Sequence, residues 1–172
     1  ISSSTVSHVL EIVNNTGATF TTAGNYAVTL SDTASVSNAN TILGDTTGAV
    51  TGTVTATGAV ATLNTNLSNA TSNDALTMVL DATTASASAL NALDGKTSVD
   101  VNASSIQSIT SSSADDVNTM VTNATAVGID SDWDVVLSDA TLSAAEVKTI
   151  NAGTSGTIDM SSATTISSST VS

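Results

Sequence analysis

The sequence predicts an α/β solenoid of about six stacked coils, each with a short helix and one or two parallel β-strands in a right-handed, β-solenoid-like winding. Apolar pairs with helical spacing recur along the whole chain, and strand-like segments lie between them. In addition, the heptapeptide Ile1–Ser7 returns unchanged as Ile166–Ser172, near the other end of the sequence. Recurrence of this kind is typical of repeat architectures.

Six predicted helices each carry two apolar residues three positions apart, so that both lie on one helical face. Longer and shorter intervals alternate between successive pairs. A glycine follows every second pair, at Gly44, Gly95 and Gly153, and predicts a left-handed stop of the helix there. The pairs are Val9/Ile12, Ala39/Ile42, Val60/Leu63, Leu90/Leu93, Val117/Met120 and Val147/Ile150.

Strand-like segments alternate with these helices, in a leucine-rich-repeat-like order. Apolar and polar residues alternate clearly from Leu76 through Met78 to Leu80, which gives such a strand one apolar face. The six main segments are Tyr26–Leu30, Ala49–Val54, Ala75–Leu80, Ser98–Val101, Asp134–Leu137 and Gly156–Met160. Extra short strands are predicted at Ser105–Ile109 and Ala163–Ile166.

The coils group into two-coil units, because long and short connections from helix to strand alternate along the chain. The units cover approximately residues 7–58, 59–115 and 116–172, and together complete a 165-residue super-period, the offset between Ile1 and Ile166. One coil has few apolar side chains to set against its ordering entropy, so it must stack on its neighbours. Residues 1–172 are therefore predicted to form a single solenoid.

The composition allows only a thin hydrophobic core and restricts the class of partner. Hydrophobic residues make up 40% of the chain, but Phe20, Tyr26 and Trp133 are its only aromatic residues. The net charge is −13, and Lys96 and Lys148 are the only lysines or arginines. Nucleic acids and anionic membranes bind through cationic side chains, so neither is an expected partner. No segment approaches the roughly 18 apolar residues of a membrane span, so membrane insertion is not expected.

A run of alternating carboxylates gives the first candidate calcium site. Asp130, Asp132 and Asp134 are spaced as in calcium loops, although the glycine and the distal glutamate of an EF-hand are missing. The alternative is a solvated acidic loop. No other cofactor is suggested by the sequence.

Three further aspartates are weaker calcium candidates. Asp32, Asp81 and Asp139 each close a predicted strand and would recur at the same corner of the solenoid. Aligned carboxylates can bind Ca²⁺, which prefers oxygen ligands. An Asx-turn or a helix N-cap is the alternative explanation, and the spacing between coils favours it.

The residues do not predict an enzyme. His8 is the only histidine, and no nucleophile motif surrounds it, so no catalytic triad is expected. The aspartates lack an accompanying aromatic platform for sugars, which weighs against glycoside hydrolysis. An enzyme built on a solenoid, such as a polysaccharide lyase, would need a cleft in which Asp, His8 or Lys side chains converge. No catalytic residue is assigned.

Several phrases resemble the tandem repeats of giant secreted surface and filament proteins of bacteria, notably marine cyanobacteria. They are the segments Val136–Val147, Ala89–Thr97 and Ser113–Thr119. The resemblance implies an extracellular, repeat-built surface or filament protein, of a kind often secreted through a calcium-associated route. It implies no catalytic residues.

Together these features predict a structural protein at the cell surface or outside the cell. The expected partner is the chain itself, either in a head-to-tail homopolymer or as the continuation of a longer repeat chain that builds a filament, sheath or surface layer. The alternative is an adhesin stalk or a binding module for cell-surface polysaccharide or another cell. An exposed pocket or aromatic patch around Tyr26 and Trp133 would favour that alternative.

Overall fold

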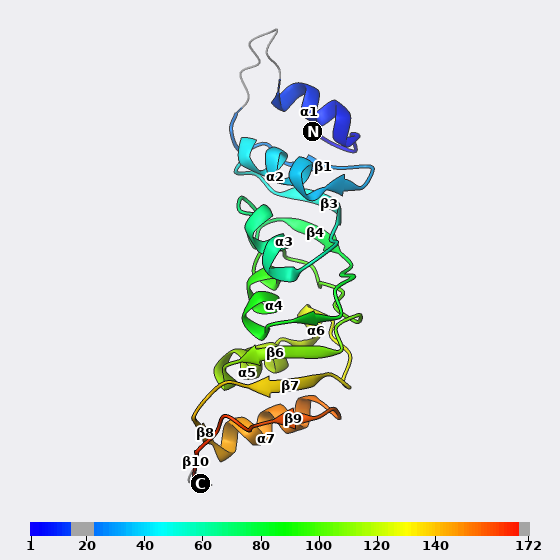
Figure 1. Ribbon diagram of the computed structural model, residues 1–172. Coiled ribbons are helices and arrows are strands. Elements are labelled where there is room, and N and C mark those ends of the chain that lie inside the picture. Colours follow the sequence, from blue (N-terminus) through cyan, green and yellow to red (C-terminus); the bar gives the residue numbers. More distant parts are fainter. Residues whose placement is uncertain (15–22, 169–172) are drawn as a thin grey trace.

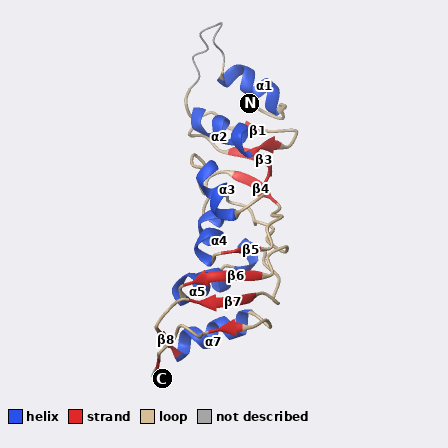
Figure 2. Ribbon diagram, in the orientation of Figure 1, coloured by secondary structure: helices blue, strands red, loops and turns tan. Residues whose placement is uncertain are grey.

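The computed structural model describes residues 1–14 and 23–168, which form an elongated molecule with most helices along one side and the strands along the other (Figure 1, Figure 2). The elements follow one another along the long axis in sequence order (Figure 1). The helices are α1 Val6–Val13, α2 Val36–Asp45, α3 Val60–Asn66, α4 Ala87–Asp94, α5 Ala114–Thr122, α6 Ala124–Val127 and α7 Ala144–Gly153. The strands are β1 Val28–Thr29, β2 Ala34–Ser35, β3 Val50–Thr55, β4 Ala75–Met78, β5 Thr84–Ala85, β6 Ser108–Ser112, β7 Asp134–Leu137, β8 Thr141–Ser143, β9 Ile158–Asp159 and β10 Thr165–Ser167.

The prediction of a mixed α/β fold with parallel strands is confirmed. Each of the six apolar pairs lies in a helix, and only the short α6 has no predicted counterpart. Five helices begin with a serine or threonine whose side chain accepts a hydrogen bond from the backbone N–H three residues later, which satisfies one of the free donors of the first turn. These N-cap residues are Thr5, Ser35, Ser86, Ser113 and Ser143.

The predicted left-handed glycine stops are wrong. Gly44 and Gly153 lie inside α2 and α7, and Gly95 follows α4 with φ −64°. Close approach explains the first two glycines instead. A Cβ on Gly44 would lie 2.7 Å from Nδ2 of Asn69, and a Cβ on Gly153 would lie 2.7 Å from the methyl carbons of Val121. Glycine therefore lets neighbouring segments approach where any side chain would collide.

All strand pairs in the described residues are parallel. In the first sheet β3 pairs with β1 and β2 along one edge and with β4 along the other. The second sheet has the order β5-β6-β7-β9, and β8 pairs separately with β10. Each pairing joins segments that a helix or a long connection separates in the sequence, which places the sheets across successive segments of the chain.

The strand predicted at Ser98–Val101 does not form. Only a single bridge, between Val79 and Asn102, remains of it. The N–H of Val101 instead donates to the carbonyl oxygen of Ala126, which belongs to α6. Because the next segment along the molecule is helical at this point, it offers no strand edge with which a ladder could form, and the two larger sheets stay separate.

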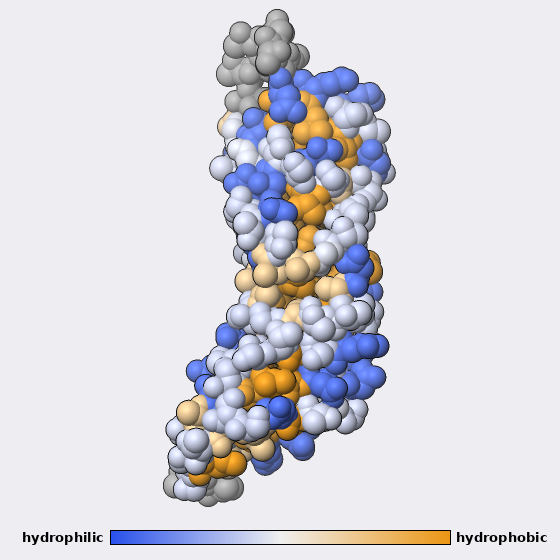
Figure 3. All heavy atoms as spheres, in the orientation of Figure 1, coloured by the Kyte–Doolittle hydropathy of each residue, from blue (hydrophilic) through white to orange (hydrophobic). Residues whose placement is uncertain are grey.

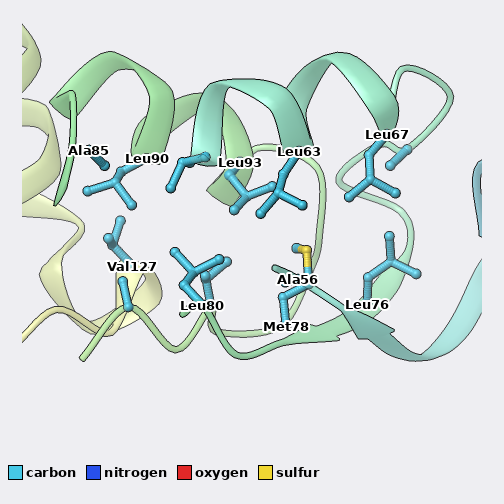
Figure 4. Close-up of a cluster of buried hydrophobic side chains, with 14 of the residues drawn as sticks. Ala56, Leu63, Leu67, Leu76, Met78, Leu80, Ala85, Leu90, Leu93 and Val127 are labelled. Carbon is cyan, nitrogen blue, oxygen red and sulfur yellow. The ribbon is translucent and has the colours of Figure 1, made fainter. Parts of the chain in front are cut away.

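A hydrophobic core runs between the helices and the strands. Leu63 and Leu67, from α3 and the residue after it, face Leu76 and Met78 of β4 (Figure 4). All four are at most 2% exposed. Burying such side chains stabilises the fold by about 1.5–3 kcal/mol each, so a thin core of aliphatic residues is sufficient to order each segment against its neighbours. Trp133 is also buried, at 1% exposure.

Candidate functional site

The three weaker calcium candidates bind backbone N–H groups near the starts of helices. Asp32 accepts a hydrogen bond from the N–H of Val6, and Asp139 accepts one from the N–H of Ala114, both at 2.7 Å. Val6 and Ala114 are the first residues of α1 and α5. A carboxylate is favourable there because the first N–H groups of a helix lack partners within the helix and carry partial positive charge.

Asp81 makes a related contact near the start of α3. Its carboxylate accepts a hydrogen bond from the N–H of Gly58 at 2.7 Å, just before α3. In all three cases the bonded residues are 23 to 26 positions apart, so each aspartate holds a segment that lies well before it in the chain. Asp32 and Asp139 bind the first residues of helices, whereas Asp81 binds the residue before the N-cap of α3. The local Asx-turn or N-cap that was the alternative to calcium is thus replaced by a bond between coils.

The first candidate calcium site surrounds the start of β7. Asp130 and Asp132 lie in the connection before this strand, and Asp134 is its first residue. The carboxylate of Asp134 accepts a hydrogen bond from the N–H of Thr157 at 2.6 Å, again between successive coils. Within residues 1–14 and 23–168, no group of three or more His, Cys, Asp or Glu side chains is arranged to hold a metal ion.

Three buried threonines make the most regular contact between coils. Thr46, Thr97 and Thr154 are 6 to 8% exposed, and each of the predicted two-coil units contains one of them. Each hydroxyl donates to a backbone carbonyl 20 or 21 residues earlier. The acceptors are the carbonyl oxygens of Tyr26 at 2.6 Å, Leu76 at 3.0 Å and Trp133 at 2.5 Å. The apolar pairs do not reveal these threonines, because every predicted unit contains many other threonines.

A line of asparagines makes an equivalent contact on the helix side. Asn64, Asn91 and Asn118 are evenly spaced in the sequence. The side-chain amide of Asn64 donates to the carbonyl oxygen of Ala89 at 2.7 Å, and that of Asn91 donates to the carbonyl oxygen of Asp116 at 2.9 Å. Successive helices are therefore linked by amides, in addition to apolar packing.

Tyr26 and Trp133, the aromatic residues in the described part of the chain, do not form an exposed patch. Trp133 is buried, and its carbonyl oxygen is bonded to Thr154. Tyr26 is half-buried, and its hydroxyl donates to the carboxylate of Asp45. Burial raises the pKa of Tyr26 to about 12, together with this hydrogen bond and the nearby negative charge of Asp45. The two rings are thus held by contacts within the fold.

A surface hollow of about 370 Å³ lies at the end of α2. Its lining includes Asp45, Asn69 and Asp74. Asp74 is only 4% exposed, and its oxygens accept from the N–H of Val50 at 2.8 Å and the N–H of Thr71 at 2.9 Å. Asp74 therefore holds the backbone of two neighbouring segments.

Three carboxyl groups have shifted pKa values for structural reasons. Hydrogen bonds from the backbone N–H and the hydroxyl of Ser161 lower the pKa of Asp159. The backbone N–H of Ser143, with its hydroxyl, lowers the pKa of Glu146 in a capping box at the start of α7. Burial raises the pKa of Asp94, with a contribution from the charge of Asp100. His8, the only histidine, is exposed on α1.

No protein-family model, curated protein or solved structure matches the chain. In the described residues, no helix has the length and apolar character that crossing a membrane requires.

Proposed function

We propose that the chain is a structural repeat protein that builds an extracellular filament, sheath or surface layer by end-to-end stacking of a right-handed α/β solenoid. The observation that carries the proposal is the recurrence of one heptapeptide 165 residues further along the chain. Ile1–Ser7 and Ile166–Ser172 have the same sequence, and their described parts lie at strand edges in both places. Such edges are templates for further pairing.

The contacts between coils support the solenoid. The carboxylates of Asp32, Asp81 and Asp139 and the hydroxyls of the buried threonines join segments 20 to 26 residues apart, which is the length of one coil. The buried threonines also agree with the two-coil units 7–58, 59–115 and 116–172, because one of them lies near the same position in each unit. Stability in such an arrangement comes from each coil and its immediate neighbours.

The surface also supports a structural role. On the face in Figure 3, apolar side chains follow a broken line along the molecule, between weakly polar ones. Ile1 and Ile166 are 37% and 57% exposed, and a further coil packed against either side chain would bury it. A net charge of −13 makes this contact dependent on screening by salt or on divalent cations such as Ca²⁺.

The test is electron microscopy of the purified chain at high concentration, with sedimentation velocity over a dilution series. The expected result is fibres or sheets with an axial repeat that matches whole stacked chains. Chelation of divalent cations is expected to loosen these assemblies without loss of the far-UV circular dichroism signal. A chain that stays monomeric at all concentrations and salt conditions would contradict the proposal.

An adhesin stalk or a glycan-binding module is the alternative. It would use an exposed aromatic platform, and the burial of Trp133 leaves it without that support. The proposed role needs no catalytic residue. The placement outside the cell rests on the resemblance to secreted bacterial surface proteins and is tested by locating the native protein with antibodies on intact cells.

A further inference from the structure

The fifth residue occupies an equivalent place in each of the six helices longer than α6, counted from the first residue of the helix. It is asparagine in α2, α3, α4 and α5, leucine in α1 and lysine in α7. In α3 and α4 its side-chain amide donates to a backbone carbonyl oxygen of the following helix, so this position lies between successive helices. The fifth-position row consists of Leu10, Asn40, Asn64, Asn91, Asn118 and Lys148.

Three oxygen atoms of this row have no hydrogen-bond donor. The side-chain oxygens of Asn64, Asn91 and Asn118 each have less than 1 Å² of accessible area and accept no hydrogen bond from any described residue. So small an area leaves no room for a solvent molecule in contact with the oxygen. A buried acceptor without a donor keeps the full cost of its desolvation, because folding removes its bonds to water and supplies none in return. Each of these oxygens therefore lowers the stability of the folded chain.

The backbone oxygens that receive the asparagine amides do not depend on them. Ala89 lies inside α4 and Asp116 lies inside α5, where a backbone carbonyl oxygen also accepts from the N–H four residues later. The amides of Asn64 and Asn91 add a second bond to these oxygens, at 2.7 Å and 2.9 Å. Loss of either amide would thus leave its acceptor bonded within the helix.

Two other members of the row provide comparisons. Leu10 packs against the hydrophobic core, which shows that leucine is accepted at this position in α1. The side chain of Asn40 has partners at both ends. Its oxygen accepts from the N–H of Asn69 at 2.9 Å, and its amide donates to the hydroxyl of Ser68 at 3.3 Å. Asparagine is therefore not needed to fill space in this row, and its cost in stability differs between helices.

The amides of Asn64 and Asn91 give the contacts between helices a direction that apolar packing lacks. The buried aliphatic side chains Leu63, Leu90 and Leu93 attract their neighbours without regard to orientation, so helices that meet through them alone can slide along each other. A hydrogen bond requires a defined length and angle, and only one alignment of the two helices satisfies it. A buried asparagine in a coiled coil fixes the register of its helices in this way, at a cost in stability.

We propose that Asn64 and Asn91 are register-determining residues. Asn64 holds α3 against α4 in a single alignment, and Asn91 does the same for α4 and α5. The unpaired oxygens of these two side chains are the cost of that alignment. The inference concerns packing within one chain, so it does not rest on the proposed assembly.

Leucine substitutions test the cost in stability. Asn91→Leu removes an unpaired oxygen, so the urea midpoint should rise by about 0.5–1 M. Asn40→Leu removes an oxygen that has a donor, so the midpoint should fall. Asn151→Leu, at an exposed position of α7, is the matched control for the higher helix propensity of leucine. Opposite signs for the first two variants, measured relative to the control, separate the unpaired oxygen from a general effect of leucine.

NMR spectroscopy of the same variants tests the register. The unsubstituted chain and Asn151→Leu should each give one set of backbone amide signals for α4 and α5. Asn91→Leu, and more strongly the double variant Asn64→Leu/Asn91→Leu, should give a second set for these helices, from a minor alignment populated to roughly 10%. Far-UV circular dichroism should be the same for all variants, which shows that the helices themselves remain.

Two results would overturn the inference. A midpoint for Asn91→Leu at or below that of Asn151→Leu would show that the asparagine stabilises the fold and carries no cost. A raised midpoint with a single set of signals in the double variant would show that apolar packing alone fixes the alignment. Both measurements use the dilute chain, so failure of the chain to form fibres changes neither of them.

Discussion

The carboxylate of Asp139 lies 2.7 Å from the backbone nitrogen of Ala114, although the two residues are 25 positions apart. Asp139 follows β7, and Ala114 opens α5 in the coil before it. The capping group of this helix therefore belongs to the next coil, in addition to the local N-cap Ser113. Through this bond the start of α5 is stabilised by a residue that lies after β7 in the chain.

Replacing Asp139 by alanine is expected to lower the free energy of unfolding by about 1–2 kcal/mol, the usual cost of losing a side-chain cap. The N–H of Ala114 would lose its acceptor, and the favourable interaction with the start of α5 would disappear. Urea denaturation measures the change. Asp132→Ala removes the same charge from an exposed position and serves as the control. If Asp132→Ala lowers the free energy of unfolding as much as Asp139→Ala does, the loss comes from the removed charge and not from the lost cap.

The substitution Thr97→Val is expected to destabilise the protein by about 1–3 kcal/mol, since it leaves buried backbone groups unpaired. The hydroxyl of Thr97 donates to the carbonyl oxygen of Leu76 and accepts from the N–H of Leu76 and of Val99. Valine keeps the shape and loses all three bonds. Thr110→Val, on an exposed position of β6, should change stability little in the same urea experiment. A loss of less than a few tenths of a kcal/mol at Thr97 would refute this account.

Ultraviolet titration of Tyr26, the only tyrosine, should give a pKa of about 12 in the folded protein. Because this value is above that of the unfolded chain, the contribution of Tyr26 to stability is fully present below pH 10 and is lost as the pH rises through about 12. Asp45→Asn removes the negative charge beside the hydroxyl and should lower the pKa of Tyr26. Asp94→Asn removes a carboxylate that does not contribute to the raised pKa of Tyr26, so this control should leave the titration unchanged.

Two glycine substitutions should act in opposite directions. Gly153→Ala puts a methyl group 2.7 Å from both methyl carbons of Val121, between α7 and α5, and is expected to cost about 1–3 kcal/mol through overpacking. Gly95→Ala meets no atom closer than 3.6 Å, at a φ of −64° that alanine accepts. It is expected to stabilise the protein by about 0.4–1 kcal/mol by restricting the unfolded chain. Thermal unfolding shows whether the midpoint falls for Gly153→Ala and rises for Gly95→Ala. An unchanged midpoint for Gly153→Ala would contradict the close approach of this position to Val121.

The sequence predicts the helices better than the contacts that join them. An apolar pair such as Val117 and Met120 marks a helix because burial of one face depends only on local spacing. The strand at Ser98–Val101 fails for the opposite reason, since a strand also needs a strand beside it, and α6 lies there instead. The short α6 carries no apolar periodicity that would reveal it.

For the candidate site, the sequence indicates which positions are equivalent but not which groups they bind. The recurrence of Asp32, Asp81 and Asp139 indicates equivalent positions, but the bonding partner of each lies 23 to 26 positions away and cannot be read from the residues around it. Thr46, Thr97 and Thr154 are individually indistinguishable from the many other threonines of this chain. They are identified only by their burial and by the hydrogen bond that each hydroxyl donates to a backbone carbonyl oxygen 20 or 21 residues earlier.

The threonine, aspartate and asparagine contacts all join segments 20 to 26 residues apart. A pulling force along the molecule would therefore load these contacts in series. Each contact that breaks would release a short length of chain while the other contacts hold. The molecule should therefore extend under tension in several small steps and not in one large step.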